Sequence, residues 1–243
     1  MEQNRRARLH QLLIADRYRD SGSIVALVCA RCVMELSVTG AGATVLSHLH
    51  NGSDGATHPS RGLVHATNPT SAALEDLQLT VGEGPCLDAF ASGGPVLVSD
   101  LTAEGAHWPA FTPGALALGV EAVFSFPLQI GVMRLGSLDF HRDVPGPLSR
   151  NELSDAQILT DMATHGIADE LAGRDTADVS WLLDPHVEVH QATGMVQVQL
   201  AVNAETALMR LRGYAFTHDL PLAEVAHQVV SRTLRFTQEE DRS

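Results

Sequence analysis

The spacing of the hydrophobic residues changes once along the chain, and this change constrains the fold more than any single motif. Before about residue 170 the pattern is mixed, with helical spacing at both ends and two-residue alternation between them, as in GAGATVLSHLH at residues 40–50. After Pro185 only the helical spacing of i, i+3, i+4 and i+7 recurs. We therefore expect an α+β domain with a mostly antiparallel sheet flanked by helices, followed by an all-α domain of three helices.

The clearest strand signal lies at residues 121–142, EAVFSFPLQIGVMRLGSLDFHR. Its alternation is interrupted at Gly131, which predicts a hairpin with Phe124, Phe126 and Leu128 on one face. Further strands are expected at residues 40–50, 63–68 and 95–101, and a glycine-rich loop at 51–62. Helices are expected at residues 24–36, 69–80 and 148–171, the second of them capped from residue 68.

Helix-start signals divide the second part of the chain. Asp184 before Pro185 marks one start, Asn203 a second and Pro221 a third. The predicted organisation is an N-terminal extension at residues 1–21, the α+β domain at 22–171 and a linker at 172–184. The helical domain then covers 185–236, and an acidic tail covers 237–243.

Composition narrows the class of protein. A hydrophobic fraction of 44% is typical of a globular chain, and no apolar run has the roughly 18 residues of a membrane span. The arginine-rich start lacks the apolar block of a signal peptide, so we expect a cytoplasmic protein that contacts no membrane. The net charge of −13 argues against nucleic-acid binding over the whole surface, but it allows a local site.

The three cysteines are too few for a four-thiolate zinc site or a disulfide framework. Cys29 and Cys32 have CxxC spacing within an apolar helical pattern, which favours packed thiols. His48 and His50, followed by His58 and His65, lack an accompanying carboxylate or thiol motif. No metal site is therefore predicted, and no cofactor is identified.

The helical pattern HQATGMVQVQL, followed by NAETALMRLRGYAFTHDLPLAEVAHQVV at residues 203–230, resembles the ANTAR domain, the RNA-binding module of transcription antitermination regulators. The matching positions are Ala192, Gly194, Ala207, Leu211, Arg212, Tyr214, Ala215, Leu222, Val225, Ala226 and Val229. The first part resembles a GAF domain through VGEGPCLDAFASGGPVLVSDL and the hairpin. Together they look like the GAF–ANTAR regulators of actinobacteria, which implies a sensor-regulated protein without enzymatic activity.

The resemblance implies that the protein is a homodimer that binds paired RNA hairpins. Such binding would prevent a terminator from forming in the RNA. The small residues Ala192 and Gly194 would let a helix or an RNA backbone approach closely. The candidate RNA-contacting side chains are Gln191 and Gln197 through their amides, Arg212 through its charge and Tyr214 by stacking, with Arg210 assigned to solvent. The plainer alternative is that these polar groups form a solvated face.

The GAF-like part is the candidate sensor for an unknown small molecule. Phe124 and Phe126 are candidate pocket residues, although an aromatic stripe is more often part of a core. Cys86 follows GEGP and would begin a helix, where backbone N–H groups favour a thiolate. This leaves open a free methionine sulfoxide reductase or a redox sensor using Cys86. A second alternative is a DNA-binding helical regulator.

Overall fold

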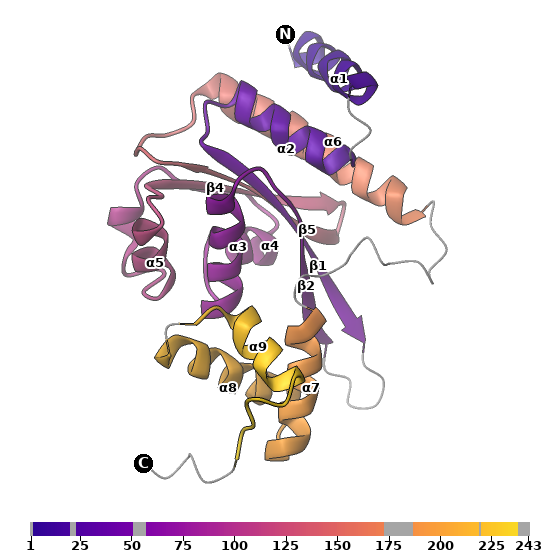
Figure 1. Cartoon of the computed structure of the whole chain (residues 1–243). Coiled ribbons are helices and arrows are strands. Elements are labelled where there is room, and N and C mark those ends of the chain that lie inside the picture. The colour runs from indigo at the N-terminus through magenta and orange to yellow at the C-terminus, as the bar shows by residue number, and fades with distance from the viewer. Residues whose placement is uncertain (1, 20–22, 51–56, 173–186, 219, 238–243) are drawn as a thin grey trace.

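The computed structural model describes residues 2–19, 23–50, 57–172, 187–218 and 220–237. Residues 23–172, here called the sheet part, hold one sheet with helices on both faces, and residues 187–237, the helical part, follow it (Figure 1). Within the described residues, no helix is both long and apolar enough to cross a bilayer.

The sheet has five antiparallel strands in the order β2-β1-β5-β4-β3. They span β1 Gly40–His50, β2 Thr57–Ala66, β3 Val96–Val98, β4 Ala122–Ile130 and β5 Met133–Arg142. The predicted hairpin is confirmed, because β4 and β5 pair along their length and Gly131 in the turn has a φ of 58°. The prediction of a loop at residues 57–62 is wrong, because these residues pair with β1 and form the first part of β2. Pairing with a neighbouring strand outweighs their turn-like composition.

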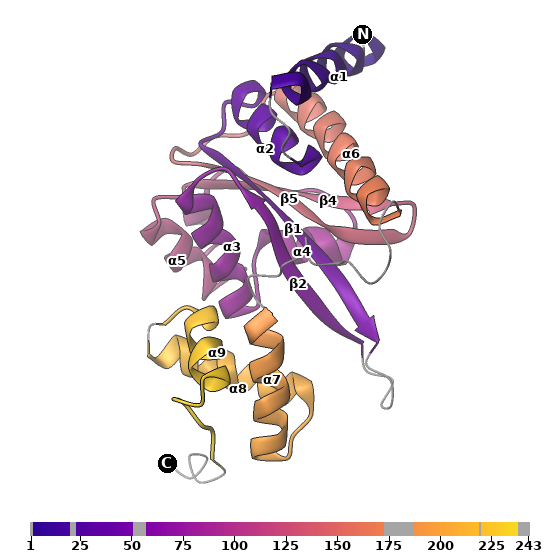
Figure 2. The same ribbon diagram turned by 45° about the vertical axis from the view of Figure 1, so that its right-hand side comes forward.

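Each face of the sheet is covered by its own set of helices (Figure 2). On one face lie α2 Ile24–Glu35 and α6 Arg150–Ala172, which enclose the larger apolar core. On the other lie α3 Pro69–Val81, α4 Pro85–Ser92 and α5 Phe111–Ala117, with a short 3-10 helix at Leu101–Glu104. The predicted cap of α3 is confirmed, because the Asn68 side chain accepts a hydrogen bond from the Ser71 N–H at 2.7 Å.

The N-terminal extension contains a helix that the sequence analysis did not predict, α1 Glu2–Arg19. Leu9 and Leu13 are buried in the larger core, so α1 adds an apolar stripe against α2 and α6. Arg5 pairs with Asp155 of α6 at 2.9 Å, and Arg31 of α2 pairs with Asp16. The extension is therefore packed on the helical layer.

The helical part contains α7 Val187–Leu200, α8 Ala204–Thr217 and α9 Leu222–Val230. The start at Asn203 is confirmed by its side chain, which accepts a hydrogen bond from the Thr206 N–H at 2.8 Å. The third start is confirmed within one residue of Pro221. Asp184, Pro185, most of the linker and most of the acidic tail lie outside the described residues.

Candidate functional site

The two faces of the sheet differ in chemistry. The apolar face carries Phe124, Phe126, Leu128, Leu138 and Phe140, all buried against α2 and α6. The opposite face carries Ser137, Asp139 and His141 from alternate positions of β5, and these side chains are also buried, under α3 and α4. A buried polar face that is covered by helices is the most unusual feature of the sheet part.

Helix α3 meets this face with a polar stripe of its own. Ser71, Glu75 and Gln78 lie at i, i+4 and i+7, so they share one side of the helix, and each is at most 3% exposed. Buried polar side chains require partners, because removing them from water costs free energy that only hydrogen bonds or ions restore. The contact between α3 and the sheet is therefore a network of polar groups.

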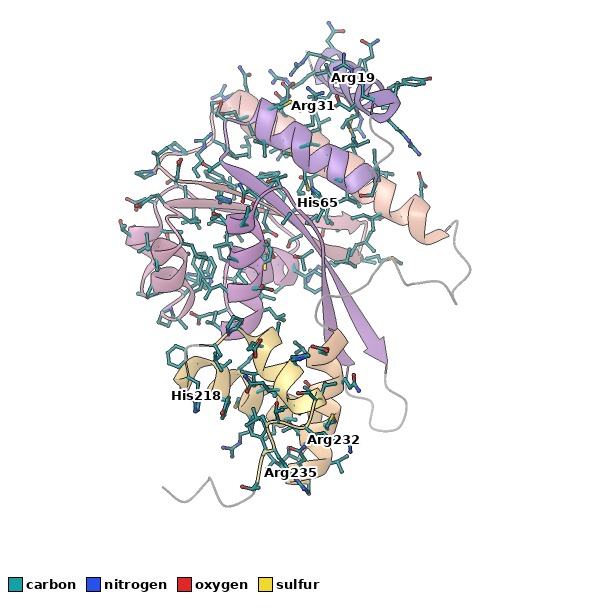
Figure 3. All side chains as sticks on the ribbon, in the orientation of Figure 1. Arg19, Arg31, His65, His218, Arg232 and Arg235 are labelled. Carbon is teal, nitrogen blue, oxygen red and sulfur yellow. The ribbon has the colours of Figure 1, made fainter. Side chains whose placement is uncertain are left out.

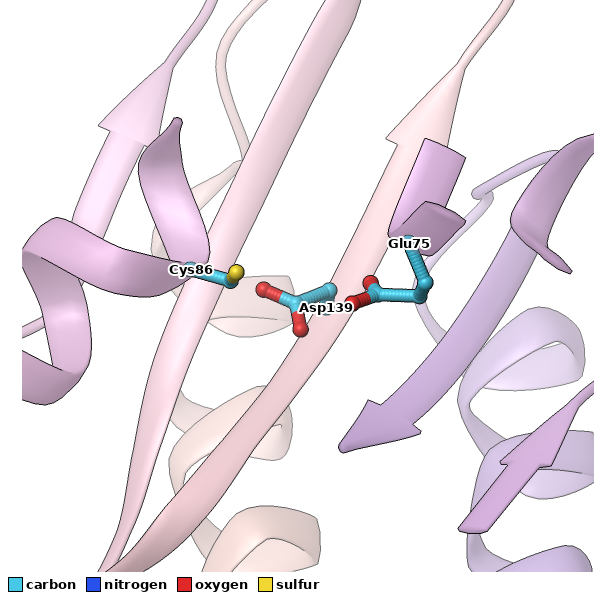
Figure 4. A group of neighbouring side chains, drawn as sticks. All are labelled: Glu75, Cys86 and Asp139. Atoms are coloured by element: carbon cyan, nitrogen blue, oxygen red, sulfur yellow. The ribbon is translucent and has the colours of Figure 1, made fainter. Parts of the chain in front are cut away.

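Glu75, Cys86 and Asp139 form the centre of this network (Figure 4). Asp139 lies between the other two side chains, and the Cys86 sulfur is directed toward its carboxylate. The ligating atoms of the three side chains all lie within 4.8 Å of one another. Among the described residues, these are the side chains whose type and spacing suit a metal ion.

Neighbouring polar groups orient all three residues. Thr44 of β1 donates to Glu75 Oε2 at 2.8 Å, and Ser137 donates to Asp139 Oδ2 at 2.7 Å. The backbone N–H of Cys86 donates to Gln78 Oε1 at 2.9 Å. Gly84 makes this last contact possible, because its φ is +140° and a Cβ there would lie 2.6 Å from Gln78 Oε1.

His141 extends the network toward the start of α3. Its Nε2 lies 3.2 Å from Ser71 Oγ, and burial lowers the pKa of His141 to about 4. The imidazole is therefore neutral at pH 7 and serves as a hydrogen-bonding group. Gly40 faces it across the strand pair, and a Cβ at Gly40 would lie 2.5 Å from His141 Nε2.

The predicted sensor residues do not share one pocket. Cys86 lies on the polar side of the sheet, whereas Phe124 and Phe126 lie in the apolar core on the other side. Phe124 and Phe126 are therefore core residues in this structure, as is more common for an aromatic stripe, and they line no surface shared with Cys86. A cavity of about 850 Å³ opens elsewhere, between α1, α2 and α6, and is lined partly by His10, Leu13 and His165.

The other two thiols are also separated from Cys86. Cys29 and Cys32 are fully buried in α2 on the apolar side, as predicted, and burial raises the pKa of both thiols well above the ordinary value. Because the sheet lies between them and Cys86, neither is placed to resolve an oxidised Cys86 in this conformation. Cys86 lies in the first turn of α4, where the sequence placed it, but it is fully buried.

The sheet part and the helical part meet at the C-terminal end of α3. Arg212 Nε of α8 donates to the Leu79 carbonyl at 3.1 Å, and the Leu222 N–H at the start of α9 donates to Thr80 Oγ1 at 3.2 Å. The Leu79 side chain is buried within the core of the helical part. Gly82 gives Arg212 room, because a Cβ at this position would lie 2.7 Å from Arg212 Nη1.

The predicted RNA-contacting residues occupy different environments in the helical part. Ala192 is fully buried in the core of the helical part, where its small side chain packs between helices. Gln191 is exposed and Gln197 half-buried on the same helix. Gly194 is half-buried, but a Cβ there would meet nothing within 4 Å among the described residues, so no contact with them requires a glycine at this position.

Tyr214 stacks on His218 with ring centroids 3.9 Å apart and an interplanar angle of 14°. Phe236 approaches the same tyrosine edge-on, with ring centroids 5.6 Å apart.

Two further arginines, which were not candidates on sequence grounds, are exposed beyond α9: Arg232 and Arg235. They lie toward the end of the helical part that is distant from the sheet (Figure 3).

No protein-family model matches the sequence, and no curated protein matches it significantly. Similar solved structures exist. The GAF domain of an Acinetobacter phosphoenolpyruvate-protein phosphotransferase superposes with a TM-score of 0.50 at 13% identity, covering 72% of this chain and 98% of its own. The corresponding GAF domain from Coxiella burnetii gives a TM-score of 0.48 at 16% identity, covering 71% and 95%. A free methionine-R-sulfoxide reductase from Thermoplasma acidophilum gives 0.40 at 14%, covering 65% and 96%.

At these identities the likeness concerns the fold and not the activity. The part of the chain that superposes on the Acinetobacter GAF domain includes the five-stranded antiparallel sheet with its helices. The sheet part of this chain therefore has a GAF-like fold.

Proposed function

We infer that this protein is a signal-regulated RNA-binding regulator, in which the GAF-like sheet part controls the helical part. One observation carries the inference: α3 joins the two. Its buried stripe of Ser71, Glu75 and Gln78 faces the polar network, and its C-terminal end holds Arg212 and the start of α9. A change in the network that shifts α3 would therefore reach the helical part directly.

RNA is the proposed partner because residues 190–230 resemble the ANTAR module in sequence. Arg212 is the charged residue among the positions that match this module, and in this structure its Nε donates a hydrogen bond to the Leu79 carbonyl of the sheet part. A guanidinium held in this way is less available to a phosphate or a base edge. We propose that the docked arrangement is the weakly binding state, and that a signal in the sheet part releases Arg212.

The proposed assembly is a homodimer, in which each copy presents one equivalent RNA-binding surface to a pair of hairpins. Helix α1 exposes the apolar side chains of Ile14 and Tyr18, which are 43% and 89% exposed. Ile14 lines a cavity together with residues of α2 and α6, and covering both side chains with a second copy would bury apolar area.

The direct test is titration of the full chain with an RNA that carries two short-loop hairpins, compared with duplex DNA and with unstructured RNA of equal length. We expect preference for the hairpin RNA. Replacing both Arg232 and Arg235 by Ala should weaken binding by at least about tenfold, since charge-assisted contacts contribute roughly 1.5–3 kcal/mol each. The matched control is R19A, because Arg19 is exposed at the opposite end of the molecule (Figure 3).

Equal affinity for hairpin RNA and for duplex DNA of the same length would contradict this function. So would a loss of binding in R19A as large as in the Arg232 and Arg235 double variant. Preference for duplex DNA would instead support the helical DNA-binding alternative.

A further inference from the structure

Three side chains that can ligate a metal converge in the interior from three separate elements. Glu75 comes from α3, Cys86 from α4 and Asp139 from β5, and none is more than 3% exposed. Their ligating atoms lie within 4.8 Å of one another (Figure 4). Only the packing of α3 and α4 onto the polar face of the sheet brings them together.

The electrostatics of this group favour a cation. Two carboxylates and a thiol at this separation repel one another when they ionise, and the low dielectric of the interior strengthens the repulsion. A divalent ion offsets that repulsion and stabilises the deprotonated forms of all three groups.

Hydrogen bonds from neighbouring hydroxyls fix the two carboxylates, as they do for ligating carboxylates in metal sites. The hydroxyls of Thr44 and Ser137 each bond one carboxylate oxygen, on Glu75 and Asp139 respectively. Hydrogen bonds of this kind fix the orientation of ligating side chains and leave the second oxygen directed elsewhere. The Cys86 backbone is fixed in the same way by Gln78.

Two buried polar atoms beside the group lack a hydrogen-bond partner in the described part of the chain: Ser125 Oγ and Gln78 Nε2. Ser125 lies directly across from Asp139 in the β4–β5 pair, so both side chains project from the same face at adjacent positions. Gln78 contacts Cys86 through the other end of its amide. Both residues are fully buried, and a water molecule bound to an ion at this place would supply the missing hydrogen-bond partners.

We propose that Glu75, Cys86 and Asp139 bind one divalent transition-metal ion of the zinc class, with a water molecule as fourth ligand. Zinc accepts sulfur and carboxylate oxygen together, at about 2.0–2.3 Å, so a modest inward adjustment of the three side chains closes the site. Magnesium and calcium are disfavoured, because they take oxygen ligands and not thiolate. Binding releases the thiol proton of Cys86 to solvent.

The test uses the reduced full chain, expressed and purified in the presence of zinc or cobalt so that the ion is available during folding. We expect about one zinc per chain by elemental analysis. The cobalt form should show the charge-transfer absorption of a thiolate–cobalt bond, which imidazole ligands on the surface do not produce.

Three variants assign the site. C86A should abolish the thiolate–cobalt band, whereas C29A, which removes a buried thiol on the other side of the sheet, should retain it. S137A leaves all three ligands in place and should weaken metal affinity by at least about tenfold, because the orienting hydroxyl is lost. Circular dichroism establishes that each variant is folded.

Absence of the thiolate–cobalt band in folded wild-type protein would overturn the proposal without reference to any variant. A band that persists in C86A, or that disappears in C29A, would overturn it by assigning the metal to other thiols. Because none of these measurements involves RNA, they test the metal site separately from the proposed regulatory function.

Discussion

Gly194 lies within α7, where a glycine lowers helix stability, and a Cβ at this position would meet nothing within 4 Å in the described part of the chain. Replacing it by Ala should raise the free energy of unfolding by roughly 1 kcal/mol. If RNA or a partner approaches the helix here, the same change should weaken RNA binding. The measurements are thermal unfolding and titration with hairpin RNA.

Gly213 of α8 provides the matched control, because a Cβ there also meets nothing within 4 Å among the described residues. G213A should stabilise the protein similarly and leave RNA affinity unchanged. If G194A and G213A behave alike in the binding measurement, close approach at Gly194 has no role in binding.

Glu152 contributes a pH-dependent stabilisation at the start of α6. Its carboxylate accepts from the Ser149 N–H at 2.7 Å and pairs with Arg142 at 2.9 Å. Burial raises the pKa of Glu152, but hydrogen bonds from Ser149 and the charge of Arg142 outweigh it, so the pKa lies below its ordinary value of 4.5. A lowered pKa in the folded state stabilises the protein above the unfolded-state pKa, and this contribution is lost as the pH falls through the folded-state value.

E152Q should therefore lower the free energy of unfolding by about 1 kcal/mol at pH 7, since Gln keeps part of the cap but loses the charge. The difference from wild type should persist down to about pH 4.5 and shrink at lower pH. Denaturant unfolding at several pH values measures it. A difference that stays constant down to pH 2 would exclude the charge as its cause.

Helix α3 is the element that connects the two parts of the chain, and Gly82 at its C-terminal end tests that connection. G82A places a Cβ against Arg212 at a positive φ, which should displace the guanidinium and cost roughly 1–2 kcal/mol of stability. If the docking of Arg212 on Leu79 restrains RNA binding, G82A should raise the affinity for hairpin RNA by about two- to tenfold. This range corresponds to the free energy of one hydrogen bond.

R212A should have the opposite effect if Arg212 itself contacts RNA, weakening hairpin binding by about tenfold or more. The two variants disturb the same contact, but only one of them keeps the guanidinium. Titrations at two salt concentrations compare them. Changes in the same direction in both variants would contradict the release of Arg212 from α3 onto RNA.

At the scale of the whole molecule we expect a homodimer that forms through α1. I14E should shift the protein toward the monomer in light scattering at micromolar concentration, because a buried charge at an apolar interface is costly. V132E is the control, since Val132 is fully exposed in the β4–β5 turn and does not belong to α1. A folded wild-type monomer at this concentration would contradict the prediction.

Local sequence pattern accounts for the features that depend on residues close together in the chain. The caps at Asn68 and Asn203, the turn at Gly131 and the apolar stripes of α8 and α9 follow from local hydrogen bonding and periodicity. These signals predict the hairpin, the helix starts at Asn68, Asn203 and Pro221, and an antiparallel sheet flanked by helices.

Which polar residues are buried depends on long-range packing. Ser137, Asp139 and His141 alternate with apolar residues, a pattern equally typical of a strand with one face in water. Their burial depends on α3 and α4, which come from a distant stretch of the chain and supply Glu75, Gln78 and Cys86. The docking of Arg212 on Leu79 depends on packing of the same kind. Contacts between residues far apart in the chain leave no periodic signal, so local pattern cannot predict them.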